Sequence, residues 1–504
     1  MSYSLLLLLL LSTFTYYVVK KSVAGITRTP TWLLWLVMMA PVLAFAFWGL
    51  SGRADEPFPI ELLLGMFVVC PVVYWMLIQW GRIPPEKQAD KQSKELQNSP
   101  EAEAVKAATE PAIVRPIDKE EEATLQHCFP WSVYYLQNIE YRPQALICRG
   151  QLRASPTVAY ETIRENVESS FGQRFLVVFQ EGLNGKPFFA LVPNPERQRA
   201  KSKARSEKLT RPGVALGLFL ITIFTTTAAG ASYVANASFA IGAAEDVSRA
   251  DPVVFFQGLP YALALMLILG VHELGHYLMT RRYQMKATLP YFIPMPFLFG
   301  TLGAFIQVRS PVPNRRALFD VGIAGPLAGL VVSLPLLWWG LAHSEVVPMP
   351  ETSSLLSFEA FNPGASIALA LLSKLALGSQ LTLENAIHMH PVAVSGCLGL
   401  VITALNLIPV GQLDGGHIVH AMYGQRTGAF IGQICRFLVL GLAFVHSELL
   451  LWAILLFFIP AVDEPALNDV SELDDKRDLW GLIALTLLVL IVLPTPGPLK
   501  ALLF

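Results

Sequence analysis

The sequence predicts an all-α polytopic membrane protein of about 9–10 transmembrane helices, with one small soluble α/β domain inserted and a re-entrant or β-like membrane loop. Two observations predict this fold class. Of the 504 residues, 53% are hydrophobic and only 15% are charged, which is too apolar for an ordinary soluble enzyme of this length. Apolar runs that can cross about 30 Å of hydrocarbon, roughly 20 residues of helix, also recur along the chain.

The apolar runs long enough to span a bilayer divide the chain into parts. They lie near residues 2–19, 31–50, 58–82, 213–235, 258–280, 317–342, 391–410, 427–444 and 478–495, and a shorter one covers 447–462. The parts are N-terminal transmembrane helices (1–82), a polar linker (83–122), an α/β domain ending in a basic run (123–211), a membrane core (212–462), and an acidic loop with a C-terminal transmembrane helix (463–504).

Basic residues set the expected orientation, because cytoplasmic loops of membrane proteins carry an excess of Lys and Arg. The segments rich in these residues are 20–28, 82–94, 197–211 and 281–316. We therefore expect the α/β domain on the cytoplasmic side, and the Lys- and Arg-poor segments 236–257 and 343–390 on the other side. The sequence leaves open whether the membrane is the plasma membrane or the thylakoid.

Charge and cysteine content exclude several kinds of partner. The formal net charge of −1 argues against a nucleic-acid partner, and the apolar spans make the lipid bilayer the expected surroundings. The five cysteines form no C-x-x-C pair, which argues against a thiolate metal site and against a disulfide framework. Nothing in the sequence sets the oligomeric state.

The inserted domain has the pattern of a small α/β unit. QALICRGQL, residues 144–152, alternates like a strand, and Ser155-Pro156 is a good start for a helix ending near Gly172. RFLVVFQEGLNGKPFFALV, residues 174–192, predicts a hairpin that turns around Asn184-Gly185. No residue of this domain carries obvious catalytic chemistry, so we expect it to regulate or to present substrate.

HELGH, residues 272–276, lies inside an apolar run that predicts a transmembrane helix. His272 and His276 are four residues apart and share one helix face, a pattern typical of two zinc ligands with Glu273 as a base. A catalytic zinc takes three protein ligands, so a third must come from elsewhere. The alternative is a polar cluster between helices or a proton relay in a transporter.

NLIPVGQLDGGHIVH, residues 406–420, offers a third ligand at a similar membrane depth. The run that ends near Pro409 crosses the membrane in the same direction as the run that carries His272, so Asp414 comes close to the same end. The two glycines after it permit a tight turn that presents the carboxylate. His417 and His420 follow within two helical turns, and spacing alone does not exclude either as the ligand.

These motifs resemble the site-2 protease family of intramembrane zinc metalloproteases (peptidase family M50), whose marks are H-E-x-x-H on one membrane helix and a downstream L-D-G. The sequence is most similar to the cyanobacterial and chloroplast EGY-like branch, which includes the plant yellow-green, gravitropism-deficient proteins. The segments that carry this resemblance are GTLGAFIQVRS (300–310), LFDVGIAGPLAG (318–329), NLIPVGQLDGG (406–416) and GQLR (150–153), where Gln151 replaces the branch's Asn. It covers roughly residues 130–495.

The resemblance implies a role for each motif residue. His272, His276 and Asp414 would hold one zinc ion per chain, and Glu273 would activate water. Asn406 would lie near the site and help to stabilise the oxyanion, whereas His417 would lie outside the ligand set. The implied function is intramembrane hydrolysis of membrane-protein substrates, as in regulated intramembrane proteolysis, with anti-sigma-factor-like or photosynthetic-membrane proteins as examples.

Two segments near the motifs have their own expected structure. TLPYFIPMPFLFGTLGAFIQVRS, residues 288–310, has three prolines and no clean helical run, which indicates a re-entrant or strand-like loop whose edge could pair with an unwound substrate. GIAGPLAG, residues 322–329, contains small residues that let helices approach closely, so we expect it to pack rather than to catalyse.

Two other functional classes compete with a protease. A membrane transporter or channel could use the histidines and the aspartate as a metal or proton path, and it would give Glu273 no role in hydrolysis. A catalytically silent scaffold is the other class, and the intact set of His272, Glu273, His276 and Asp414 argues against it.

Overall fold

The computed structural model describes most of the chain from residue 117 onward. The described ranges are 117–142, 145–182, 185–194, 211–235, 252–295, 299–349, 358, 360–382, 384–443 and 449–504, together with residues 27, 29–50 and scattered positions before residue 82. The chain divides into two compact units, Met1–Ala112 and Ile113–Phe504. The predicted runs at 2–19 and 58–82, the linker up to residue 116 and most of the basic run at 197–211 lie outside the described residues or are described only at scattered positions.

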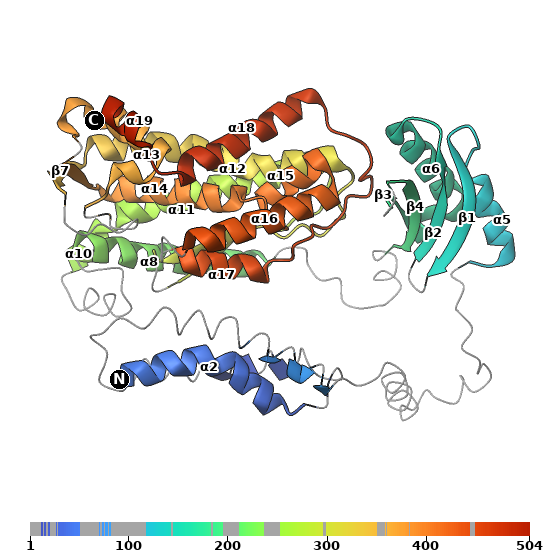
Figure 1. Ribbon diagram of the computed structural model, residues 1–504, viewed down its shortest axis with the longest axis horizontal. Helices are drawn as coiled ribbons and strands as arrows, with labels where there is room; N and C mark the ends of the chain where they lie inside the picture. The colour runs from blue at the N-terminus through green and yellow to red at the C-terminus, as the bar shows by residue number, and fades with distance from the viewer. Residues whose placement is uncertain are drawn as a thin grey trace. The chain divides into compact units, whose positions relative to one another are not determined.

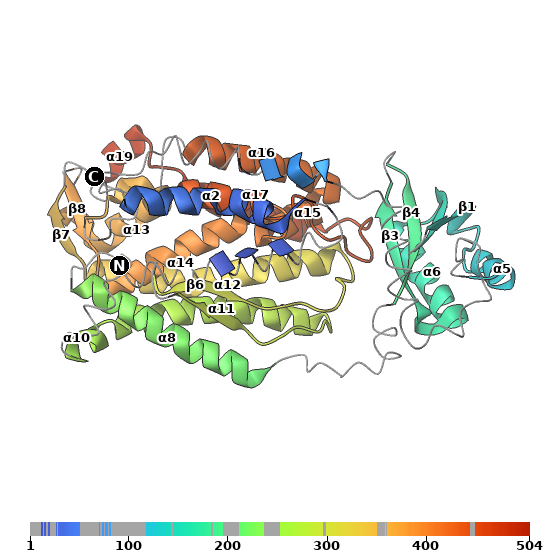
Figure 2. The same cartoon turned by 90° about the horizontal axis from the view of Figure 1, so that it is seen from below.

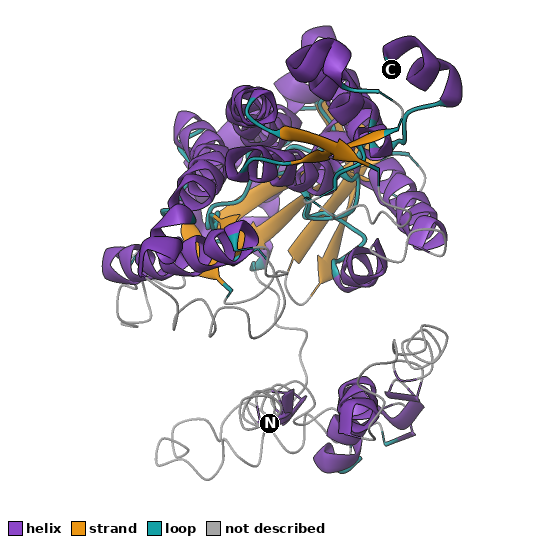
Figure 3. Cartoon of the chain, turned by 90° about the vertical axis from the view of Figure 1, so that its left-hand side faces the viewer, coloured by secondary structure: helices purple, strands orange, loops and turns teal. Residues whose placement is uncertain are grey.

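Helices make up most of the described structure, and its strands belong to three small sheets (Figure 3). The α-helices are α2 (Thr31–Leu50), α5 (Lys119–His127), α6 (Pro156–Phe171), α8 (Pro212–Val234), α10 (Pro252–Gln257), α11 (Leu259–Arg282), α12 (Arg315–Ala342), α13 (Ile367–Leu377), α14 (Pro391–Leu407), α15 (Asp414–Tyr423), α16 (Gln425–Ala443), α17 (Leu450–Phe458), α18 (Asp475–Val492) and α19 (Gly497–Leu503). Short 3-10 helices cover Gly172–Arg174, Pro363–Ala365 and Gly378–Gln380.

Among the described residues, four helices are long and apolar enough to cross a membrane: α8, α11, α12 and α16. A fifth span results if α18 and α19, which meet at an angle of 81°, count as one. The chain is therefore a polytopic membrane protein, as predicted. The run predicted at 391–410 forms α14, which has 17 residues and is shorter than a full span. The total of about ten spans stays a prediction.

The helical core is built around α11, α12 and α14, which pack against one another, while α8 packs on α11. Figure 2 shows α8, α11, α12 and α14 side by side in that order. Small residues allow these helices to approach closely, since a Cβ on Gly396 would lie 2.7 Å from Leu337 Cα and one on Gly275 would lie 2.6 Å from the Ala324 oxygen. The close packing of α11 on α12 places His272, Glu273 and His276 inside the protein, whereas Leu274 of the same motif is exposed.

A four-stranded antiparallel sheet with helices α5 and α6 forms the α/β unit (Figure 1). Its strands are β1 (Tyr134–Arg142), β2 (Ala145–Leu152), β3 (Phe175–Glu181) and β4 (Pro187–Pro193), in the spatial order β1-β2-β4-β3. The strand predicted at 144–152, the helix starting at Ser155-Pro156 and the hairpin are confirmed. The unit has its own apolar core, in which Phe179 stacks on Phe189 with ring centroids 4.1 Å apart.

Helix α5 begins inside the segment that was expected to be a linker. The charged residues at 118–122 show no apolar periodicity, but Asp118 and Glu121 form a capping box in which each side chain accepts a hydrogen bond from the other's backbone N–H. Leu125 and Cys128 then bury against the core of the unit. The ordered α/β unit therefore starts before residue 123, because capping and two buried side chains stabilise a helix of otherwise polar composition.

The loop between α11 and α12 is strand-like, as predicted. It forms a two-stranded antiparallel sheet from β5 (Tyr291–Pro294) and β6 (Thr301–Phe305), which packs against α8 and α11. A second small sheet joins β7 (Glu345–Pro348) to β8 (Asn385–His388). The first sheet lies beside the helix that carries HELGH.

Candidate metal centre

Helix α11 positions two of the three predicted ligands. His272 and His276 occupy its C-terminal half, one helical turn apart, and their ring centroids are 4.9 Å apart. Both side chains are buried, with exposed fractions of 5% and 9%. Polar side chains inside a membrane protein require partners, and these two histidines find theirs on α12, α14 and α15.

Asp414 is the first residue of α15, where the positive end of the helix dipole favours a carboxylate. The backbone reaches this position through two close contacts, each at a glycine. Gly411 has a φ of +49° and lies against the Pro460 carbonyl, and a Cβ on Gly415 would lie 2.7 Å from the Ile408 oxygen. The chain can therefore turn back after α14 only with small residues at these positions, and of the two the L-D-G-G pattern predicted Gly415.

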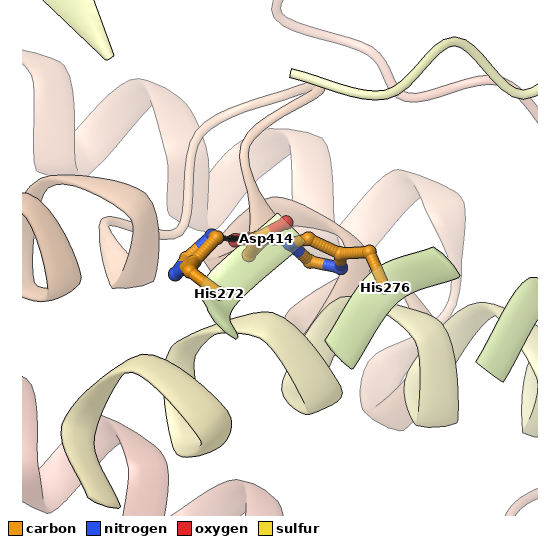
Figure 4. A group of neighbouring side chains, drawn as sticks. All are labelled: His272, His276 and Asp414. Carbon is orange, nitrogen blue, oxygen red and sulfur yellow. Dashed lines mark hydrogen bonds and ion pairs between the residues drawn. The ribbon is translucent and has the colours of Figure 1, made fainter. Parts of the chain in front are cut away.

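The three ligand atoms converge on one point (Figure 4). His272 Nε2 lies 3.2 Å from His276 Nε2, and Asp414 Oδ2 lies 3.5 Å and 3.3 Å from these two nitrogens. In a tetrahedral site with bonds of about 2.0–2.1 Å, ligand atoms are separated by roughly 3.3–3.4 Å. The separations and the nitrogen and oxygen donors therefore fit a zinc ion, and this is the one such group of His, Cys, Asp and Glu within the described residues.

A backbone carbonyl fixes the orientation of His276. Its Nδ1 lies 2.8 Å from the oxygen of Val321 on α12. Because a carbonyl oxygen can only accept, Nδ1 must carry the proton and donate it, which leaves Nε2 free to bind a metal.

Asn406 and Glu273 lie beside the ligands. Asn406 Nδ2 is 3.3 Å from His272 Nε2, so the residue that was predicted to be near the site is in contact with it. Glu273 is buried with an exposed fraction of 6%, and its carboxylate lies near the backbone of Ile306, directly after β6. The predicted base therefore sits between the ligand cluster and the strand-like loop.

His417 and His420, the two alternative ligands, point elsewhere. Both Nδ1 atoms lie 2.8 Å from the same oxygen of Asp463, and His420 Nε2 lies 2.9 Å from Asp469. Asp414 is thus the residue of this segment that the fold brings to His272 and His276.

The carboxylates that hold these two histidines were missed in the sequence, although the acidic composition of 463–475 was a signal for them. Burial alone lowers the pKa of His420, but the hydrogen bonds that His420 donates to Asp463 and Asp469 outweigh it and raise the pKa to about 9. Burial likewise raises the pKa of Asp463, and the bonds to His417 and His420 outweigh that effect and lower it to about 2. His420 and Asp463 are therefore charged and paired at neutral pH.

Comparison with known proteins agrees with this geometry. Residues 260–446 match the model of Peptidase family M50, and this range includes all three ligand residues. These residues are a peptidase family M50 domain. The resemblance to the site-2 protease family and its EGY-like branch, which was inferred from the motifs, is confirmed.

Several relatives of this chain are plant proteins. The probable zinc metalloprotease EGY2, chloroplastic, of Arabidopsis thaliana is 29% identical over 374 residues, which are 73% of this chain and 63% of that protein. The Arabidopsis protein EGY1 is 29% identical over 66% of this chain and 64% of its own length, and EGY1 of Oryza sativa subsp. japonica is 30% identical over 56% and 50%. The chain thus spans less than two thirds of these relatives. No solved structure matches it.

Proposed function

We propose that the chain is an intramembrane zinc metalloprotease that hydrolyses peptide bonds of membrane-embedded, single-pass protein substrates. The observation that supports this most strongly is the convergence of His272 Nε2, His276 Nε2 and Asp414 Oδ2 with a buried glutamate beside them. The two Arabidopsis relatives are named probable zinc metalloproteases, which agrees with the choice of metal. One zinc ion per chain follows from the single ligand group in the described part of the chain.

The ligand residues and Glu273 divide the chemistry between them. When bound, zinc supplies a Lewis acid that polarises the scissile carbonyl and lowers the pKa of water to about 7. Glu273 accepts the proton of the attacking water and then delivers it to the leaving amine. Asn406, next to His272, donates a hydrogen bond to the oxyanion that develops on the carbonyl.

The strand-like loop supports a way to bind the substrate. A transmembrane substrate hides its carbonyl groups in helical hydrogen bonds, so a segment must unwind and find new partners. The β5–β6 sheet has only two strands, and Leu302 and Phe305 of β6 are exposed. We infer that an unwound substrate segment pairs with an edge of this sheet, close to Glu273.

The location of the protein is part of the proposal. The α/β unit is a soluble domain on the cytoplasmic side, or on the stromal side if the membrane is a thylakoid, because basic residues flank it. The chloroplast relatives favour the thylakoid over the plasma membrane.

A transporter that uses the histidines as an ion path is the competing function, and Glu273→Gln separates the two. Gln keeps the shape of the side chain and leaves the three ligands intact, but it cannot accept a proton. The purified variant should bind zinc and cleave a single-pass membrane substrate in liposomes at least about a hundredfold more slowly, since such a base typically supplies about 10²–10⁴-fold.

The controls for this experiment use the same liposomes. Glu345→Gln, on β7 and outside the ligand cluster, should cleave as fast as the unchanged protein. Cleavage at the normal rate by Glu273→Gln would refute the proposed mechanism, and a change in ion flux without any uncut substrate would favour the transporter.

A further inference from the structure

Three glycines of α12 face the ligand cluster. Gly322, Gly325 and Gly329 are spaced by three and four residues, so they lie on one face of the helix. A Cβ on Gly329 would lie 3.2 Å from His272 Nδ1, and one on Gly322 would lie 3.0 Å from His417 Cβ and 3.2 Å from the backbone carbonyl oxygen of Asp414. The backbone of α12 therefore packs directly against residues of the candidate metal centre.

The approach at Gly325 is the tightest of the three. A Cβ there would lie 2.5 Å from Cδ2 and from Cε1 of His276, and closer still to Nε2, whereas Cβ atoms in proteins essentially never come within 3.0 Å of a neighbour. The obstacle is a rigid aromatic ring rather than the end of a flexible chain. Any side chain at this position would therefore push the imidazole away from α12.

The position of Gly325 in the helix explains why the ring comes so close. In an α-helix, the carbonyl of residue i points toward residue i+4, so the side chain at position 325 borders the approach to the Val321 carbonyl. His276 Nδ1 donates its proton to that same carbonyl, at 2.8 Å. A carbonyl oxygen has two lone pairs and can accept from the helix and from the imidazole together.

We propose that Gly325 is a positioning residue: its missing side chain lets the His276 imidazole reach the Val321 carbonyl, and this bond aims Nε2 at the metal. The inference rests on the proposed zinc site and assigns to the GIAGPLAG segment a role beyond helix packing. An imidazole displaced by about 0.5 Å or more exceeds the roughly 0.2 Å that metal–ligand distances tolerate.

The test is the zinc affinity of the full-length protein in detergent, measured by competition with a chelator. Gly325→Ala should weaken zinc binding at least about tenfold, the lower end of the range for lost partners of metal-binding histidines. It should also change the visible spectrum of the cobalt-substituted protein, because that spectrum reports the geometry of the ligands. A purely structural role in helix packing would leave both readouts unchanged in the folded fraction.

Three other glycines supply matched controls. Gly217 of α8 and Gly441 of α16 have nothing within 4 Å of a Cβ, so their Ala variants should bind zinc like the unchanged protein. Gly340 of α12 is also tight, with a Cβ 2.7 Å from Ala393 Cα, but it faces α14 instead of a ligand. Gly340→Ala should lower the unfolding temperature and keep the zinc affinity of the folded fraction.

The outcomes separate this inference from the proposed function. Normal zinc affinity and an unchanged cobalt spectrum in Gly325→Ala would overturn the inference and leave the zinc site standing. If the unchanged protein bound no zinc, both the inference about Gly325 and the proposed zinc site would be wrong. Should Gly325→Ala not fold, Gly329→Ala decides: a weaker affinity than in Gly217→Ala supports the role of the α12 surface, and an equal affinity overturns it.

Discussion

The ligands of the candidate metal centre have different surroundings. His276 donates to the Val321 carbonyl through Nδ1, Asn406 contacts the metal-facing Nε2 of His272, and Asp414 sits at the start of α15. The outer contact of His276 fixes its side-chain rotamer before a metal arrives, which reduces the entropy lost on binding. His417 is only three residues from Asp414, yet its partner is Asp463.

This difference at the residue scale predicts the zinc content of two variants. Asp414→Ala removes one of three ligands and should lose most of its zinc, whereas His417→Ala should retain about one zinc per chain, as the intact ligand set requires. Metal analysis by mass spectrometry of the purified proteins measures both. Full zinc in Asp414→Ala together with loss in His417→Ala would transfer the third-ligand role to His417.

At the scale of the element, α15 is a short helix that is held at several points. Asp414 at its start faces the metal centre, and the Arg315 side chain donates to the Ala421 carbonyl at its end, at 2.8 Å. On its side, His420 is paired with Asp463 and Asp469 and has an exposed fraction of 1%. The helix that presents Asp414 therefore depends on a buried charged group outside the metal centre.

That buried group predicts how stability varies with pH. The folded pKa of His420, about 9, lies above its ordinary value, so its contribution is complete below about pH 6.5 and is lost as pH rises through 9. Asp463 has a lowered pKa of about 2, so its contribution is lost only as pH falls through that value. Both shifts include the shared contact between His420 and Asp463, so they do not add, and the contribution of His420 is of the order of 3 kcal/mol.

Thermal unfolding in detergent between pH 6 and pH 9.5 measures this effect. The unchanged protein should lose stability across this range, and His420→Ala should start less stable and show a flatter dependence. His127→Ala, on α5 and outside this group, is the control and should follow the unchanged protein. An equally steep dependence in His420→Ala would show that another group titrates.

At the scale of the whole molecule, the loop 463–474 joins the α/β unit to the helical core. Phe179 of β3, an edge strand, donates to the Leu467 carbonyl and accepts from Asp469 N–H. The N–H of Leu467 in turn donates to the Val312 carbonyl, just before α12. Since one loop contacts both, we expect the α/β unit and the segment before α12 to lie on the same side of the membrane.

Cysteine labelling tests this arrangement and the proposed sidedness. In a background without the native cysteines, Lys203→Cys and Arg309→Cys should react with a membrane-impermeant maleimide only from the cytoplasmic or stromal side, because both lie in basic segments. Glu345→Cys, on β7, should react only from the other side. Labelling of Lys203→Cys and Arg309→Cys from opposite sides would contradict both the loop contacts and the basic-residue rule.

The sequence by itself determined the features that depend on local spacing. The pairing of His272 with His276 follows from helical periodicity, and the hairpin of β3 and β4 follows from strands separated by a turn. The start of α5 was harder to predict. The helix is stabilised locally by a capping box, but also by two side chains that pack into a core made of residues distant in the sequence. Local patterns report the state of a segment but do not report what it packs against.

Only the tertiary structure shows which of Asp414, His417 and His420 lies against His272 and His276. Spacing left all three open, because they lie within two turns of one short helix. The choice depends on which face of α15 meets α12 and which face meets Asp463, a residue 43 positions beyond His420. Gly325 is a similar case. The role of this glycine depends on which residue occupies the space where a side chain would be, and packing between distant elements determines that residue.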